Sequence, residues 1–173
     1  MHAVPDRGLE NDLSEAADLV ATLASLLRGR SAALATAESC TGGMIAAACT
    51  ALAGSSEWFE RGFVTYSNAA KTEMLGVGAE LIARHGAVSA EVALAMAEGA
   101  LARSKAAWSV AVTGIAGPGG ATPGKPVGTV WLAIAGKGST ARAELLQLEG
   151  DRASIRSQTV DRALQRLIDA VRA

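Results

Sequence analysis

The segment Thr36-Ala-Glu-Ser-Cys-Thr-Gly-Gly43 lies between an apolar run, residues 32–35, and a helix-forming run, residues 44–52. This order predicts a buried strand that turns directly into a helix. A hydroxyl at such a junction lies beside the free N–H groups of the helix N-terminus, which favour negative charge. Ser39 is therefore the candidate nucleophile, and a helix cap is the ordinary alternative role for a serine at this position.

Two glycines close this segment. Because glycine has no side chain, the backbone there can approach a ligand closely. We expect a developing oxyanion or a phosphate group to be bound by the N–H groups of Thr41, Gly42 and Gly43.

The composition predicts a folded domain that acts on a small solute. The chain has 173 residues, of which 50% are hydrophobic and 19% charged, and its net charge is −1. This balance argues against disorder and against a nucleic-acid binder that relies on a basic surface. Charged residues interrupt every apolar run, so no contact with a membrane is expected. Residues 1–10 are predicted to be a flexible N-terminal tail, and residues 11–173 a single domain.

Two cysteines, Cys40 and Cys49, lie within one predicted turn and helix. A disulfide between them would close only a short loop, and the N-terminus lacks an apolar signal segment. We therefore expect both thiols to be reduced, in a cytoplasmic protein. Cys40 is expected to face the core, because no imidazole is placed to lower the pKa of its thiol.

Apolar periodicity predicts strands that alternate with helices. Strands are expected at residues 31–36, 62–67, 108–113, 128–134 and 141–148, with helices at 11–28, 44–52, 68–75, 81–85, 89–103 and from 151 onward. Asn68 is predicted to cap the short helix that holds Lys71, and Gly76 to end it. This order predicts an α/β fold, in which a mixed sheet has helices on both faces.

Ligands of such open sheets bind beyond the carboxyl ends of the parallel strands. This rule places three segments on one rim: the Ser39 turn, the turn from Asn68 to Lys71, and the loop after Thr113. The two histidines, His2 and His85, lack a convincing acidic partner for a Ser-His-Asp triad. Lys71 is therefore the candidate base for the serine.

For Lys71 to accept a proton, it must be neutral at the working pH. Its pKa must then fall from about 10.4 to about 7 or 8, which requires on the order of 4 kcal/mol of desolvation or like-charge repulsion. The mechanism therefore predicts a dry or positively charged pocket. The ordinary alternative is a solvated lysine on a helix.

Further polar side chains are candidates for this rim. Tyr66 could hydrogen-bond Lys71 or relay a proton, although a strand tyrosine more often only packs its ring. Ser56, in a Gly-Ser-Ser loop, is a candidate substrate contact or an ordinary loop cap. Candidate anion contacts are Thr113, Lys125, Arg152 and Arg156.

Metal and phosphate-loop chemistry is not predicted. Residues 119–125 fit the spacing of a phosphate-binding P-loop, but Pro126 and a strand follow where that motif needs a hydroxyl and a helix. No cluster has the spacing of a zinc site, so we expect no metal and no cofactor.

Several longer motifs, taken together and in order, are far more specific than any one of these residues. They are Ala37–Gly43, Gly54–Asn68 with Lys71, His85–Ser89, Thr113–Pro118, Lys125–Trp131 and Gly150–Arg152. Over nearly the whole chain they resemble one family: the C-terminal domain of the competence/damage-inducible protein CinA, whose stand-alone members are nicotinamide-nucleotide amidases.

The resemblance implies a three-layer α/β/α sandwich around a mixed, mostly parallel five-stranded sheet. It also implies hydrolysis of nicotinamide mononucleotide to nicotinic acid mononucleotide and ammonia, by a metal-free serine–lysine amidase. Ser39, Lys71 and Tyr66 would be catalytic, and either Ser39 or Ser56 would attack. The substrate contacts would include Asn68, Thr113, Gly114 and Arg152. A homodimer is expected from the family. Longer relatives carry a further domain that resembles molybdopterin-binding proteins, and we do not expect its activity here.

This substrate has a cationic pyridinium ring and a phosphate group. We expect the ring to meet an aromatic face such as that of Trp58, and the phosphate to meet Arg152, Lys125 or a helix N-terminus. Two other functions remain open at this point. One is a nucleotide-binding or regulatory module without turnover, and the other is an amidase that acts on a different carboxamide.

Overall fold

Five strands form the central sheet, in the order β2-β1-β3-β4-β5. The computed structural model describes residues 7–173, with side chains from Glu15 onward. The strands are β1 (Leu34–Glu38), β2 (Phe59–Val64), β3 (Trp108–Gly114), β4 (Thr129–Gly136) and β5 (Arg142–Gln147). β1 is parallel to both β2 and β3, whereas β4 is antiparallel to β3 and β5. The sheet is therefore mixed with one reversed strand, as predicted.

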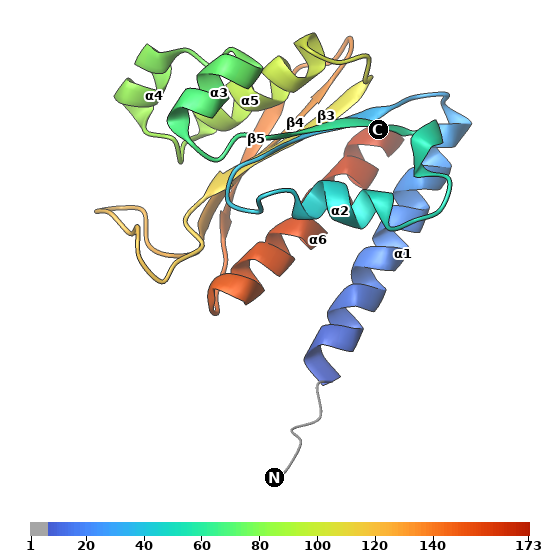
Figure 1. Ribbon diagram of the computed structural model, residues 1–173, viewed down its shortest axis with the longest axis horizontal. Helices are drawn as coiled ribbons and strands as arrows, with labels where there is room; N and C mark the ends of the chain where they lie inside the picture. The colour runs from blue at the N-terminus through green and yellow to red at the C-terminus, as the bar shows by residue number, and fades with distance from the viewer. Residues whose placement is uncertain (1–6) are drawn as a thin grey trace.

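Helices cover both faces of this sheet (Figure 1). One face carries α1 (Arg7–Gly29), α2 (Met44–Thr50) and α6 (Arg152–Arg172), and the other carries α3 (Asn68–Leu75), α4 (Ala79–His85) and α5 (Ala90–Ala102). Each face has its own cluster of buried apolar side chains, so the sheet is desolvated on both sides. This confirms the predicted three-layer α/β/α architecture.

In the sequence, residues at four-residue spacing mark one face of the last helix as apolar, and this face is buried in the structure. Ile155, Thr159, Ala163, Leu167 and Val171 are each no more than 1% exposed. The four-residue spacing aligns them on one side of α6, which packs against α1 and the sheet. Asp151 caps the helix, since its Oδ1 accepts a hydrogen bond of 2.8 Å from Ser154 N.

Three local predictions were wrong. α1 begins at Arg7 and not at residue 11, and the part of the predicted tail before it, residues 1–6, lies outside the described part of the chain. β2 spans Phe59–Val64 and not residues 62–67, because Phe59 already pairs with Leu34 of β1. The cap of α3 is Ser67 and not Asn68, since Ser67 Oγ accepts a hydrogen bond of 3.0 Å from Ala70 N.

Gly99→Ala should destabilise the fold by about 1–3 kcal/mol, because added bulk in a packed interior strains its neighbours. A Cβ at Gly99 of α5 would lie 2.2 Å from the carbonyl oxygen of Leu75, at the end of α3. Urea denaturation measures the effect. Gly29→Ala is the matched helical control, since a Cβ there meets nothing within 4 Å. Equal stability of the two variants would contradict the proposed close packing of α5 on α3.

Candidate active site

The structure brings Ser39 and Lys71 into contact. Ser39 follows β1 directly, and Lys71 lies in α3, 32 residues further along the chain. The two atoms Lys71 Nζ and Ser39 Oγ are 3.0 Å apart. Because β1 and β2 are parallel, the junctions that follow them meet at the same edge of the sheet, as the rim argument predicted.

Two backbone carbonyls fix the orientation of the lysine amine. Lys71 Nζ donates to the oxygen of Thr65 at 2.9 Å and to the oxygen of Tyr66 at 3.3 Å. A carbonyl oxygen only accepts hydrogen bonds, and a neutral amine has two N–H donors and one lone pair. If both N–H groups of a neutral Lys71 are used on the carbonyls, its lone pair faces Ser39 Oγ.

Burial favours the neutral form of Lys71. The side chain is 1% exposed, and desolvation lowers its pKa below the ordinary value of 10.5. None of the ion pairs in the described part of the chain includes this lysine. The surroundings are therefore of the dry kind that a lysine base requires, and the alternative of a solvated helix lysine does not hold.

Glu38 is a buried site residue that sequence reasoning missed. Its carboxylate is 1% exposed and accepts three hydrogen bonds: from Thr41 Oγ1 at 2.7 Å, Ile45 N at 2.8 Å and Ala46 N at 3.0 Å. It thus occupies the N-terminus of α2 that was expected to bind an anion. A carboxylate at the start of a helix is favourable, because its oxygens accept hydrogen bonds from the free N–H groups and its negative charge compensates the helix dipole.

The N–H groups expected to bind an oxyanion are consequently not all free. The N–H of Gly42 donates to the oxygen of Ser39 at 3.0 Å, and the carboxylate of Glu38 takes the N–H groups of the first helical turn. The N–H groups of Cys40, Thr41 and Gly43 donate no backbone hydrogen bond in the described part of the chain, and of these three the N–H of Cys40 adjoins Ser39. The backbone donor nearest to Ser39 in the sequence is therefore the N–H of Cys40.

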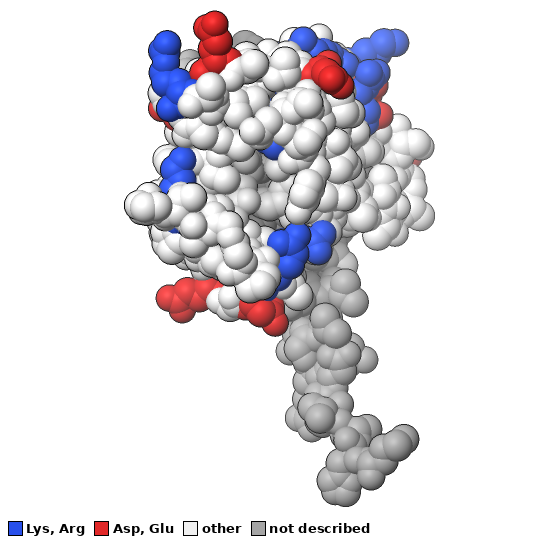
Figure 2. Space-filling view, turned by 60° about the vertical axis from the view of Figure 1, so that its left-hand side comes forward, with Lys and Arg blue, Asp and Glu red and all other residues white. Residues whose placement is uncertain are grey.

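A hollow of about 210 Å³ opens beside the serine–lysine pair. Figure 2 shows one face of the molecule, on which largely uncharged residues surround a central hollow and a group of Lys and Arg side chains lies below it. Seven predicted site residues line it: Ser39, Tyr66, Asn68, Lys71, Thr113, Gly114 and Arg152. Sequence reasoning missed the other four: Cys40 as a lining residue, Ala87, Val88 and Ala116. Thr41, Gly42 and Gly43 are not among the lining residues.

Arg152 joins α6 to the rim of this hollow. Its Nη2 donates to the hydroxyl of Tyr66 at 3.1 Å, and its Nη1 donates to the oxygen of Gly117 at 2.8 Å. Tyr66 is 61% exposed, and only its backbone carbonyl contacts Lys71. The predicted hydrogen bond between the tyrosine hydroxyl and the lysine is therefore not formed. Thr113, also in the lining, donates its hydroxyl to the oxygen of Ala87 at 2.8 Å.

Ser56 and Trp58 lie at the opposite edge of the sheet. Both precede β2, so they are at the amino end of the parallel strands, whereas Ser39 is at the carboxyl end of β1. The length of a five-residue strand, on the order of 15 Å, separates the two edges. Ser56 is exposed in a short 3₁₀ helix, and Trp58 is fully buried in the core. Neither is brought near the Ser39 hydroxyl, so the expected stacking on Trp58 is wrong.

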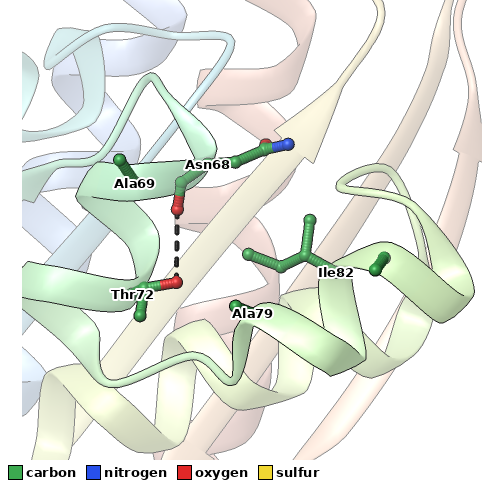
Figure 3. A pocket seen from close by; sticks show the side chains of 6 residues that line it. Asn68, Ala69, Thr72, Ala79 and Ile82 are labelled. Carbon is green, nitrogen blue, oxygen red and sulfur yellow. Dashed lines mark hydrogen bonds between the residues drawn. The ribbon is translucent and has the colours of Figure 1, made fainter.

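A second hollow, of about 260 Å³, lies between α3 and α4. Figure 3 shows Asn68 and Thr72 of α3 facing Ala79 and Ile82 of α4 across it, with the Thr72 hydroxyl bonded to the backbone oxygen of Asn68 at 3.4 Å. No titratable side chain lines it. Asn68 also lines the hollow beside Ser39, so it forms part of the wall between the two.

Neither cysteine is a nucleophile in this site. Cys40 and Cys49 are unbridged and buried, and burial raises the pKa of the Cys40 thiol to about 11 and that of Cys49 to about 12. Cys40 therefore stays a thiol at neutral pH.

Among the described residues no group of three or more His, Cys, Asp or Glu side chains could hold a metal ion. Nor does the described part of the chain contain a helix long and apolar enough to cross a bilayer.

The fold and this site define a three-layer α/β/α protein with a buried serine–lysine pair at the carboxyl edge of its sheet. The chain belongs to the CinA C-terminal domain family, whose model matches residues 16–171. Among solved structures, a competence/damage-inducible protein from Agrobacterium tumefaciens superposes with a TM-score of 0.89, at 44% identity and with full coverage of both chains.

Relatives of two lengths share this domain. The nicotinamide-nucleotide amidohydrolase PncC of Pseudomonas putida is 55% identical over 87% of this chain and 93% of its own, and the protein of that name from Escherichia coli K12 is 50% identical over 89% and 93%. A CinA-like protein from Akkermansia muciniphila is 58% identical over 80% of this chain. The chain spans about a third of such CinA-like proteins, 33% in this case.

Proposed function

We propose that the protein is a nicotinamide-nucleotide amidase, which hydrolyses nicotinamide mononucleotide to nicotinic acid mononucleotide and ammonia. The observation that carries the proposal is the contact between Ser39 and a buried lysine whose N–H groups are directed at two carbonyls. Such a lysine can accept the serine proton without a metal or a histidine. The names of the full-length relatives supply the substrate class.

In the first half of the reaction, Lys71 takes the hydroxyl proton while Ser39 Oγ attacks the carboxamide carbon. The N–H of Cys40 holds the oxyanion, because it adjoins the nucleophile and donates no backbone hydrogen bond among the described residues. The C–N bond then breaks, and the proton on Lys71 passes to the leaving nitrogen as ammonia departs. Water attacks the acyl-enzyme in the second half, with the same lysine as base, and Ser39 is regenerated.

The rest of the nucleotide is held by the rim. Arg152 binds the phosphate, since a guanidinium matches its oxygens in charge and geometry. Tyr66 presents an exposed ring to the cationic pyridinium, and its hydroxyl is already oriented by Arg152. We therefore assign Tyr66 to substrate binding in place of a proton relay. Asn68, Thr113 and Gly114 form the walls around the carboxamide.

An assay of ammonia release tests this function. Purified protein should release ammonia from nicotinamide mononucleotide, much faster than from free nicotinamide, and a chelator should not change the rate. Thermal stabilisation by the nucleotide without ammonia release would favour the nucleotide-binding or regulatory module. Faster turnover of another carboxamide would favour an amidase of different specificity.

The pH dependence of kcat/KM should follow Lys71. Activity requires the neutral amine, so kcat/KM should rise with pH and level off above the pKa of Lys71, which burial places below 10.5. Initial rates, corrected for non-enzymatic loss of the substrate at high pH, give the profile. Activity that falls as pH rises over this range would contradict a lysine base.

The proposed setting is the cytoplasm, where reducing conditions keep Cys40 and Cys49 as thiols. The partner is a small nucleotide, and neither nucleic acid nor a membrane has a role in the reaction. We also propose a homodimer, which analytical ultracentrifugation tests directly.

A further inference from the structure

Two glycines end the turn that carries the nucleophile, and one hydrogen bond, from Gly42 N to the oxygen of Ser39, closes it. We define the nucleophile turn as residues 39–43, which connect β1 to α2. Its last two residues, Gly42 and Gly43, have φ angles of 57° and 106°. Glycine adopts such angles readily and also leaves them readily, because it has no Cβ to restrict the backbone. The bond within the turn fixes the peptide unit between Ser39 and Cys40, so groups outside the turn are needed to hold the peptide units that follow it.

Arg156 contacts this turn from α6. Its Nε donates to the oxygen of Cys40 at 3.1 Å, and its Nη2 donates to the oxygen of Thr41 at 3.2 Å. The contacts join residues 116 and 115 positions apart in the sequence. A Cβ at Gly42 would lie 3.6 Å from Arg156 Nη2, so the guanidinium lies directly against the turn. Arg156 is not among the residues that line the hollow beside Ser39.

These contacts bear on the direction of the Cys40 N–H. A peptide unit is planar and trans, so its N–H and C=O point in opposite directions. The oxygen of Ser39 points into the turn, where it accepts from the N–H of Gly42. The N–H of Cys40 belongs to the same peptide unit, so it points out of the turn. Arg156 holds the next peptide unit, through the oxygen of Cys40, and thereby limits rotation about the Cys40 backbone.

We propose that Arg156 is a positioning residue, which clamps the backbone of the nucleophile turn so that the Cys40 N–H stays aligned for the oxyanion. The proposal rests on the proposed function for its reaction, but not on the identity of the substrate. It differs from the sequence-based expectation that Arg156 binds an anion. The arginine acts through two carbonyls, whereas Arg152, one turn earlier on α6, reaches the rim.

The test uses an alkyl fluorophosphonate, which reports on the serine whatever the natural substrate is. Ser39 Oγ forms a bond to phosphorus, the P–F bond breaks, fluoride leaves and the serine proton passes to Lys71. The phosphoryl oxygen takes the position of the oxyanion during this step. Mass spectrometry of the intact protein and of the Ser39 peptide gives the maximal labelling rate at saturating probe.

Arg156→Gln should lower the maximal labelling rate at least about tenfold, since a displaced oxyanion donor loses much of its effect. The pH midpoint of labelling should not move, because Lys71 is untouched. Arg162→Gln is the matched control. Arg162 lies on the same helix, its side chain is exposed and makes no hydrogen bond among the described residues, and this variant should label at the wild-type rate. Melting temperatures of all variants separate loss of stability from loss of rate.

Three results would overturn the proposal. They are a wild-type labelling rate in folded Arg156→Gln, a loss of rate explained by a shifted pH midpoint, and wild-type protein whose Ser39 does not react at all. If Arg156→Gln does not fold, Arg156→Lys is tested in its place. A lysine amine cannot reproduce the two hydrogen bonds that the guanidinium makes to two carbonyls. A wild-type labelling rate in Arg156→Lys would therefore also overturn the proposal. Labelling of Ser39 without ammonia release would refute the proposed amidase and leave the clamp to be judged by the labelling rates.

Discussion

Ser39→Ala should lower kcat for ammonia release by at least about 10³-fold, because removing a nucleophile eliminates the covalent pathway. Among the described residues the hydroxyl makes one hydrogen bond, with Lys71, so the variant should fold normally. It should also keep its affinity for nicotinamide mononucleotide, because the hollow and Arg152 are unchanged. Steady-state kinetics measure the first effect, and the thermal shift caused by the nucleotide measures the second.

Ser56→Ala is the matched control for this experiment. It removes the other hydroxyl that the sequence offered as the attacking group, and the structure places it exposed at the far edge of the sheet. Its turnover should equal that of the wild type. If Ser56→Ala were inactive and Ser39→Ala active, the assignment of the nucleophile would be reversed.

Lys71→Met should reduce kcat by about 10³-fold or more, because methionine has a similar length but cannot accept a proton. Two opposing effects on stability are expected. The carbonyls of Thr65 and Tyr66 lose a donor, while the cost of burying an amine disappears. The melting temperature should therefore change little compared with the activity.

Lys137→Met controls for the general effect of replacing a lysine. Lys137 is exposed in the turn between β4 and β5, next to Gly136, which pairs with Trp108 at the start of β3 and so lies at the edge of the sheet opposite Ser39. This variant should retain full activity. Substantial turnover in folded Lys71→Met would show that another group takes the proton from Ser39, and the serine–lysine mechanism would be wrong.

The sequence predicted the serine–lysine pair because each residue follows a strand. Two parallel strands bring their carboxyl ends together, so the positions of Ser39 and Lys71 in the pattern were sufficient to place them on one rim. The helical spacing of apolar residues likewise predicted the buried face of α6. These features depend on periodicity and on strand direction, both of which a single sequence contains.

Other features depend on contacts between distant residues, which a single sequence does not reveal. Glu38 ends a buried strand, and nothing in its position shows that its carboxylate caps the following helix. The role of Arg156 requires the register of α6 against the turn of Ser39. Trp58 fell within a family motif, but it lies at the far edge of the sheet because β2 begins at Phe59. The alternation of apolar residues had predicted a later start for this strand.

The lysine and the two carbonyls that orient it lie on one short stretch, residues 65–71, and Nζ reaches back six residues to Thr65. Its alignment therefore depends on a local bend of the chain, whereas Arg152 belongs to a different, remote helix. The orientation of the base and the phosphate contact at Arg152 are thus encoded in separate parts of the gene. A substitution at Arg152 can change how the nucleotide is held while the local geometry that orients Lys71 stays unaltered.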